Sequence, residues 1–267
     1  MVNIKYIARR LTFTKEIRGI FPKIQFFIEE LISLSTRIGP NGLRQINWIG
    51  PHGDVILNYY DSIVCWRSEI LDDHLYDIKF KTKNPIILDI GANQGFFSLW
   101  IKYNNPSALI HAFEPVKKSF EILKKNINDN KYYGINTYNI GVLDKTKTLT
   151  IRNIKGGAGL GDSICIDNNL DKYDKEEIKV MNIDSLFKYT PKFDLVKIDI
   201  EGSEYPVIKN CNFWKKSDML IIEFHDMFKK SFGYEDIDFL NIIEKAGFVK
   251  IDQIGEYPTY VCRYIKK

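Results

Sequence analysis

Short apolar runs without a helical period alternate, over most of this chain, with segments whose apolar residues recur every three or four positions. The clearest run extends from Pro85 to Ile90, where isoleucine and leucine surround a single aspartate. Gly91 and Gly95 then interrupt the pattern, and apolar residues resume from Phe96 to Trp100. This order predicts a buried strand, a turn marked by glycines and the start of a helix.

The same alternation continues to the end of the chain. It predicts core strands at Ala108–Phe113, Ile135–Val142, Phe193–Ile198 and Met219–Phe224, and helices at Val116–Asp129 and Ile237–Ala246. It also predicts short strands at 148–151 and 178–181, a short helix at 185–189 and a terminal pair of strands split at 255–258. Alternating strands and helices indicate an α/β fold with a mostly parallel central sheet flanked by helices.

The first 83 residues precede this core, and we expect them to form an N-terminal extension or cap before a domain of residues 84–267. Apolar residues from Pro22 to Ile38 have helical spacing and predict an amphipathic helix. Residues 45–66 predict two short strands or an irregular cap, and 68–81 a segment that begins as a helix. The helix is expected to pack against the main domain; the alternatives are docking to a partner and peripheral contact with an anionic membrane surface.

The amino-acid composition limits the classes of protein to which this chain can belong. The chain has 267 residues, of which 45% are hydrophobic and 27% are charged, as in ordinary globular proteins. No apolar run approaches the ~18 to 20 residues that a membrane span requires. Six of the basic residues fall within the first 23 positions, so the remainder of the chain is close to neutral despite the net charge of +4. Nucleic-acid binding by the core is therefore not expected.

The cysteines indicate the compartment. Cys65, Cys165, Cys211 and Cys262 are far apart in the sequence and include no CxxC pair. The N-terminal residues lack the apolar stretch and cleavage site of a secretory signal. We therefore expect a reducing, cytoplasmic location.

The glycine turn predicts a small-molecule site, because a strand that ends in glycine brings backbone N–H groups close to a ligand. A dinucleotide fingerprint requires Gly-x-Gly-x-x-Gly, but counting from Gly91 the second and third glycines are replaced by Asn93 and Phe96. This weakens a nicotinamide-binding interpretation. The pattern Asp89-x-Gly91-x-Asn93-x-Gly95 instead resembles the first motif of Rossmann-like methyltransferases that use S-adenosylmethionine, which has no pyrophosphate.

Polar residues after the next two strands extend this predicted site. Glu114 ends the second strand, 23 positions after Gly91, where a carboxylate could accept both hydroxyls of a ribose. Its alternative role is to complement the dipole of the following helix. Asn139, Gly141 and Val142 end the third strand and are candidates for contact with adenine, with strand packing as the alternative.

Acidic residues follow the fourth strand. Asp199 and Glu201 emerge beside the pocket that the glycine turn opens, where a carboxylate can orient or deprotonate an attacking hydroxyl. The alternative for Glu201 and Glu204 is that they complement the dipole of the next helix.

A histidine lies at the end of the fifth strand. His225 is two residues from Glu223, so the two share a face if the strand extends that far, and a histidine is a candidate general base. Its alternative role is to cap the strand or bond a neighbouring carboxylate. Glu223, His225, Asp199 and Glu201 could alternatively bind a divalent metal, but their spacing matches no known metal-ligand signature, so no metal is predicted. The glycine-rich loop Gly156–Gly161 lacks a phosphate-binding signature and is predicted to be a mobile lid.

Five motifs occur together in a characteristic order: LDIGANQGFFSLW, AFEP, IDSL, KIDIEGSE and IIEFH. Over residues 84–250 the chain resembles the FkbM family of methyltransferases. The resemblance implies a Rossmann-like methyltransferase fold with an antiparallel strand near the C-terminus, S-adenosylmethionine as the donor, and usually O-methylation of sugars or natural-product hydroxyls. Ser203 replaces an alanine that is frequent in the family.

The resemblance also implies roles for individual residues. Asp89, Gly91, Asn93 and Gly95 would line the methionine side of the donor, and Glu114 would bind its ribose. Asp199 and Glu201 would lie near the transferred methyl group. The expected partner is a small-molecule or glycan acceptor. Two alternatives remain open at this point: a nicotinamide-dependent oxidoreductase on a similar sheet, and a catalytically inactive donor-binding module.

Overall fold

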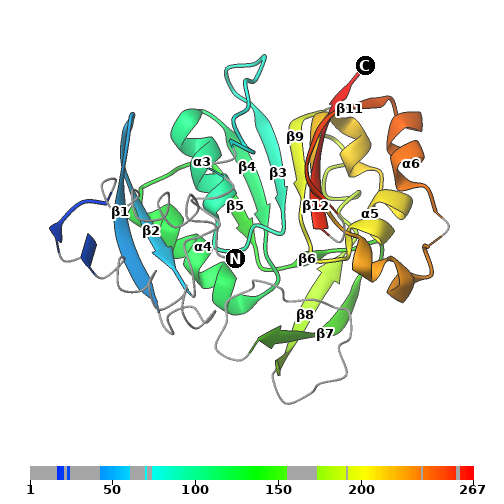
Figure 1. Ribbon diagram of the computed structural model, residues 1–267, viewed down its shortest axis with the longest axis horizontal. Coiled ribbons are helices and arrows are strands. Elements are labelled where there is room, and N and C mark those ends of the chain that lie inside the picture. Colours follow the sequence, from blue (N-terminus) through cyan, green and yellow to red (C-terminus); the bar gives the residue numbers. More distant parts are fainter. Residues whose placement is uncertain are drawn as a thin grey trace, which may run out of the picture.

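The computed structural model describes residues 17–20, 23–24, 43–60, 70, 74–154, 173–190, 192–235, 237–256 and 259–267. Their centre is a seven-stranded sheet with the order β11-β12-β10-β9-β3-β4-β5 (Figure 1). Every neighbouring pair among the strands from β10 to β5 is parallel, whereas β12 is antiparallel to both of its neighbours. The strands are β3 (Ile86–Ile90), β4 (Leu109–Phe113), β5 (Ile135–Tyr138), β9 (Phe193–Ile198), β10 (Ser217–His225), β11 (Phe248–Glu256) and β12 (Thr259–Lys266).

Helices cover both faces of this sheet. In Figure 1, α3 and α4 lie to one side of the strands and α5 and α6 to the other. Their bounds are α3 (Phe96–Asn104), α4 (Lys117–Asp129), α5 (Glu204–Asn210) and α6 (Phe239–Lys245). The two-residue period of the strands explains this division, because successive side chains point to opposite faces. Ile87 joins the apolar cluster beneath α3, and its neighbour Leu88 joins the cluster beneath α5 and α6.

The predicted α/β architecture is confirmed, including the antiparallel strand near the C-terminus. Two local predictions were wrong. The segment 185–189 forms turns and no helix. The single strand predicted at Ile135–Val142 is two strands, β5 and β6 (Gly141–Val142), which belong to different sheets.

A small second sheet explains this division of the third predicted strand. Its order is β6-β8-β7, with β7 (Lys147–Ile154) antiparallel to β8 (Tyr173–Met181). Gly141 lies so close to β8 that a Cβ atom there would be 2.9 Å from a methyl carbon of Val180. The chain therefore leaves the main sheet after Tyr138 because its next residues pair with β8. The small sheet lies below the main sheet in the view of Figure 1.

An N-terminal hairpin packs against α4 and confirms the two short strands predicted there: β1 (Arg44–Gly50) and β2 (Gly53–Tyr59). Asn126 of α4 accepts a hydrogen bond from the backbone N–H of Asn58 (2.7 Å), and its amide donates to the carbonyl groups of Asn58 and Gln94. Asn130 bonds both backbone groups of Ile56. Helix side chains thus satisfy the backbone at the open edge of β2, which a lone hairpin would leave exposed.

Several predicted features lie outside the described residues. These are most of the helix predicted at 22–38, the start of the segment predicted to be helical at 68–81, and the loop Gly156–Gly161. Among the helices that are described, none is both long enough and apolar enough to span a membrane.

Shortening a side chain at the centre of the sheet tests this account of the core. Leu88 is fully buried, so Leu88→Ala should lower the free energy of unfolding by about 2–5 kcal/mol, because it leaves a cavity. The same change at the half-exposed Leu186 should alter it by no more than about 0.5 kcal/mol. Urea unfolding of both variants measures the difference. Equal losses would show that Leu88 is not at the centre of the core.

Candidate active site

A pocket opens at the carboxyl ends of β3, β4 and β9, where open parallel sheets bind their ligands. It contains about 690 Å³ of empty space, including the part open to solvent. Residues from the loops after these strands and from the small sheet line it: Gly91, Asn93, Phe113, Glu114, Pro115, Val116, Gly141, Val142, Ile151, Ile178, Val180, Asp199, Ile200, Glu201 and Ser203.

Gly91 allows the ends of β3 and β9 to approach each other closely. Its φ is +80°, and a Cβ atom at this position would lie 1.7 Å from the carbonyl oxygen of Asp199. The N–H groups of Gly91 and Ala92 both donate to the carbonyl of Phe113, at 3.0 and 2.9 Å. The chain therefore crosses the end of β4 immediately after β3, and only glycine fits at the crossing.

Asn93 carries a polar atom that needs a partner. Its φ of +48° places it in the left-handed region, which asparagine tolerates better than most residues. Its side-chain Oδ1 is buried and has no hydrogen-bond partner among the described residues, and the residue lines the pocket. A buried acceptor of this kind is costly unless a ligand or ordered water donates to it. Asn93 is therefore suited to a ligand that presents an N–H or O–H group.

Glu114 is 5% exposed and lies at the wall of the pocket, as the strand pattern predicted. Its Oε2 accepts from the backbone N–H of Asn93 and its Oε1 from that of Val116, both at 2.8 Å. A carboxylate oxygen has two acceptor lone pairs, so these bonds do not prevent it from accepting a ligand hydroxyl. Glu114 therefore also holds the glycine turn against β4, a role that the sequence did not reveal.

Three of the predicted cofactor-binding residues do not line the pocket. Asp89 is fully buried beneath it and accepts from the Ser98 hydroxyl at 2.6 Å. A Cβ atom at Gly95 would lie 2.4 Å from the side chain of Leu123, so this glycine allows α3 to pack against α4. Asn139 is exposed, and its amide donates to the carbonyls of Glu114 and Pro115. These residues shape the site from outside, whereas Gly91, Asn93, Glu114, Gly141 and Val142 line it.

A buried lysine joins the two central strands. Lys197 is 4% exposed, and its Nζ lies 3.0 Å from Asp199 Oδ2 and 3.2 Å from the carbonyl oxygen of Gly91. Asp89 Oδ1 is 3.8 Å away. Burial raises the pKa of Asp89, against the opposing attraction of Lys197. The only signal for Lys197 in the sequence is a lysine within the mostly apolar segment Leu195–Ile198.

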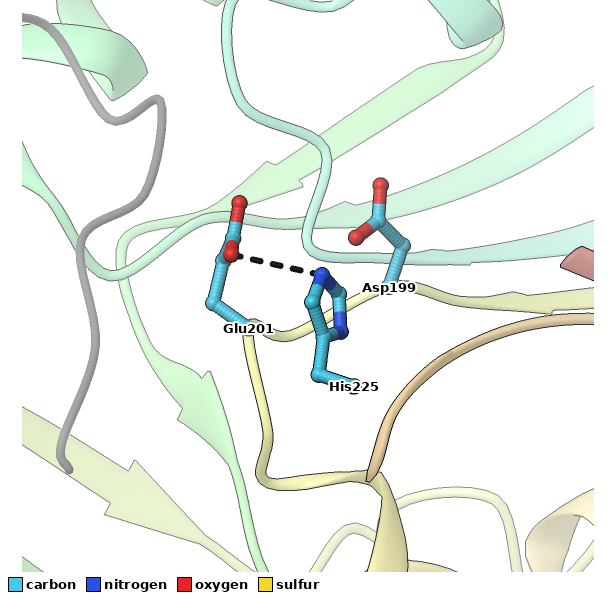
Figure 2. Close-up of side chains that lie close together, drawn as sticks. All are labelled: Asp199, Glu201 and His225. Carbon is cyan, nitrogen blue, oxygen red and sulfur yellow. Dashed lines mark ion pairs between the residues drawn. The ribbon is translucent and has the colours of Figure 1, made fainter. Parts of the chain in front are cut away.

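Asp199, Glu201 and His225 converge beside this pocket (Figure 2). Asp199 and Glu201 belong to the segment that follows β9, and His225 ends β10. His225 Nε2 lies 3.3 Å from Glu201 Oε2, and Nδ1 lies 3.1 Å from Oε1 of the buried Glu204. Glu223 lies close as well, with Oε1 3.9 Å from Nε2. The structure thus brings together all three residues predicted to be catalytic.

The charge of His225 is set by its acidic neighbours. Burial by itself lowers the pKa of the imidazole, but the hydrogen bond and charge of Glu204, with the charges of Glu201 and Asp199, raise it to about 10. In the protein without ligands, His225 is therefore positively charged near neutral pH. An added cation would change this balance.

The turn that carries Glu201 is conformationally strained. Glu201 has a φ of +50°, and the following Gly202 has a φ of +97°, where a Cβ atom would lie 2.2 Å from the ring of Phe228. Two backbone N–H groups of this turn, from Ile200 and Gly202, donate to Glu204 Oε1. A non-glycine residue held at positive φ is uncommon and occurs often at functional sites.

With this geometry established, comparison with known proteins identifies the family. Residues 89–250 match the model of the methyltransferase FkbM domain, which is more than half of the chain. The chain is 30% identical over 188 residues to Methyltransferase sdnD of Sordaria araneosa, covering 58% of this chain and 72% of that protein. It is 23% identical over 180 residues to Methyltransferase 1 of Beauveria bassiana (strain ARSEF 2860), covering 60% and 72%.

A solved FkbM methyltransferase from Methylobacillus flagellatus KT aligns at 13% identity, covering 98% of this chain and 59% of its own, with a TM-score of 0.46. The family model decides the assignment, and the chain belongs to the FkbM family of methyltransferases, which use S-adenosylmethionine.

The pocket suits this cofactor. S-adenosylmethionine carries an ammonium group and two ribose hydroxyls, and the pocket offers the unpartnered Asn93 Oδ1 and the Glu114 carboxylate as acceptors. The glycine at position 91 leaves the space beside Asp199 clear of a Cβ atom. The cofactor also has a positively charged sulfur, and the charged residues that line the described pocket are all acidic.

Adding a methyl group at Gly91 tests the importance of this close approach. Gly91→Ala should weaken the binding of S-adenosylhomocysteine at least about 10-fold, because the Cβ atom pushes β3 away from Asp199. Gly233→Ala is the control: its φ is +67°, but a Cβ atom there meets nothing within 4 Å. Both variants pay the cost of about 1–2 kcal/mol for a left-handed alanine. Calorimetric titration should show impaired binding only for Gly91→Ala; equal binding by both would contradict this role.

Proposed function

We propose that this protein transfers a methyl group from S-adenosylmethionine to a hydroxyl oxygen of a sugar or a natural product. The observation that carries the proposal is the convergence of Asp199, Glu201 and His225 beside the cofactor pocket. Carboxylates are groups that bind a hydroxyl and take up its proton, and the charged imidazole beside them holds Glu201 in place. Membership in a methyltransferase family excludes the nicotinamide oxidoreductase considered from the sequence.

The residues divide the pocket into a donor side and a transfer side. On the donor side, Glu114 would accept the ribose hydroxyls, and Asn93 would accept from the amino group of the methionine portion. Gly141 and Val142, with apolar residues of the small sheet, would contact the adenine. On the transfer side, Asp199 and Glu201 would face the methyl group. The paired strand ends hold the two sides at a fixed separation, because Gly91 touches Asp199.

Bound S-adenosylmethionine would supply an activated methyl group, whose carbon would bond to the acceptor oxygen while the electron pair of the broken C–S bond would remain on sulfur. The chain's residues position the acceptor for this displacement. Glu201 lines the pocket, so its carboxylate would receive the hydroxyl proton, and its contact with the charged His225 would hold it in place. Asp199 is held in place by Lys197 and would place its negative charge beside the sulfonium.

The lining also favours a class of acceptor. Lysine and arginine are absent from the described residues that line the pocket, whereas three of these residues are acidic. A phosphate-bearing acceptor would be repelled by these carboxylates. Ile151, Ile178 and Val180 present an aliphatic wall from the small sheet. A neutral hydroxyl compound fits the acidic part of this lining better than an anionic one.

Glu201→Gln tests the transfer side. The substitution preserves shape but removes the charge, so turnover should fall about 10²-fold or more while the affinity for S-adenosylhomocysteine stays within about 3-fold. Transfer of labelled methyl to a panel of sugars, glycans and natural-product alcohols measures turnover. Glu121→Gln, on the exposed surface of α4, is the matched control and should retain full activity. Donor binding without transfer to any hydroxyl would instead favour an inactive binding module.

Glu114→Gln tests the donor side. Losing the charged acceptor should reduce the affinity for S-adenosylhomocysteine about 10- to 100-fold, because hydrogen bonds to charged groups contribute about 1.5–3 kcal/mol. Calorimetric titration alongside Glu201→Gln separates the two sides of the pocket. Unchanged donor affinity in Glu114→Gln would show that its carboxylate does not bind the ribose.

A further inference from the structure

The geometry of Asp199, Glu201 and His225 points to a binding site for one divalent cation of the Mn²⁺ or Mg²⁺ type. The sequence spacing predicted no metal, because the ligands come from two strands whose ends meet only in the folded protein. This inference rests on the proposed methylation of a hydroxyl and specifies how the site would hold the acceptor oxygen.

The three side chains lie near the separations that a cation requires. One ligand atom from each lies within 4.8 Å of the other two, and His225 Nε2 is 3.3 Å from Glu201 Oε2. Two adjacent ligands on a cation with bonds of about 2.1 Å are separated by about 3 Å. Figure 2 shows that the three side chains are directed toward a common space. Small side-chain movements would therefore complete a three-ligand site.

Access to this space is from the pocket side. The side chains of Asp199 and Glu201 are 24% and 29% exposed, and both residues line the pocket. His225 closes the site from the interior, with only 7% of its side chain exposed. A cation with three protein ligands keeps open positions for water or substrate, as in catalytic metal sites. Those positions would face the place where an acceptor hydroxyl is expected.

Outer residues fix the ligands in the manner of known metal sites. The buried Glu204 contacts His225 Nδ1 at 3.1 Å, which directs Nε2 toward Glu201 and Asp199. A carboxylate that bonds the outer nitrogen of a histidine is the usual support of a metal-binding imidazole. Lys197 anchors one oxygen of Asp199 at 3.0 Å. Both anchors are almost completely buried, so the ligand positions are set by the core of the fold.

A second observation indicates a missing polar partner in the same pocket. Ser203 is 3% exposed and lines the pocket two residues after Glu201, and its hydroxyl has no hydrogen-bond partner in the structure. Burying an unpaired hydroxyl is unfavourable. A water molecule bound to a cation beside Glu201 would be a strong donor to Ser203 Oγ.

The ligand set selects the type of cation. Two carboxylates and one imidazole supply hard oxygen ligands with a single nitrogen, and among the described residues no cysteine belongs to the cluster. This set suits Mn²⁺ or Mg²⁺ better than cations that prefer thiolates. Mn²⁺ is the better probe, because its paramagnetic resonance signal reports the bound ion directly, without any methyl transfer.

The experiment titrates Mn²⁺ into chelator-treated protein, with and without S-adenosylhomocysteine, and follows the free ion by paramagnetic resonance. One saturable site per chain is expected. Asp199→Asn, Glu201→Gln and His225→Gln should each weaken it at least about 10-fold, as expected for loss of a ligand. Glu223→Gln is the matched control: it removes a carboxylate 3.9 Å from the same imidazole but none of the three ligand atoms, so Mn²⁺ affinity should change less than about 3-fold. Thermal melts verify that each variant is folded.

The outcomes separate this inference from the proposed function. Absence of saturable Mn²⁺ binding at millimolar concentration overturns the cation site. The site is also overturned if all three ligand variants bind Mn²⁺ as tightly as the unaltered protein. Hydroxyl methylation that proceeds unchanged after chelation also overturns the site and leaves the proposed function in place. Binding that is lost in the ligand variants supports the site; if the same protein methylates no hydroxyl, only the proposed function fails.

Discussion

The contact between Gly91 and the Asp199 carbonyl is the constraint on which the site depends. It lets two parallel strands end side by side with no side chain between them, so the loop after β3 and the turn after β9 form the two walls of one pocket. Lys197 reinforces the contact from within, since its ammonium group bonds the Gly91 carbonyl and the Asp199 carboxylate together. A larger residue at position 91 would separate both walls.

Buried charged residues hold the polar groups of the site in place. A buried lysine between carboxylates contributes little net stability, because desolvation offsets most of the attraction. It does fix the position of Asp199, and Glu204 does the same for His225. Glu204 also binds the strained turn that carries Glu201. Rigid placement of polar groups is what methyl transfer requires, because the acceptor, methyl carbon and sulfur must lie in line.

The acidic character of the pocket is consistent with the cofactor of the family to which the chain belongs. A sulfonium is stabilised by nearby carboxylates, whereas a pyrophosphate would be repelled by them. The same carboxylates, with His225, have the donor atoms and separations of a cation site. Donor binding and acceptor activation would then use neighbouring parts of one acidic surface.

The alternation of strands and helices, the glycine turn and the order of the polar strand ends can all be predicted from the amino-acid sequence. These features depend on the burial of each residue within its own element, which apolar periodicity records. The tertiary structure alone decided which polar residues share a cavity. It turned Asn139 outward, placed Asp89 and Gly95 behind the pocket wall, and moved residues 141–142 into a second sheet. Lys197, Glu204 and His225 interact because β9 pairs with β10, and local pattern carries no information about which strands pair.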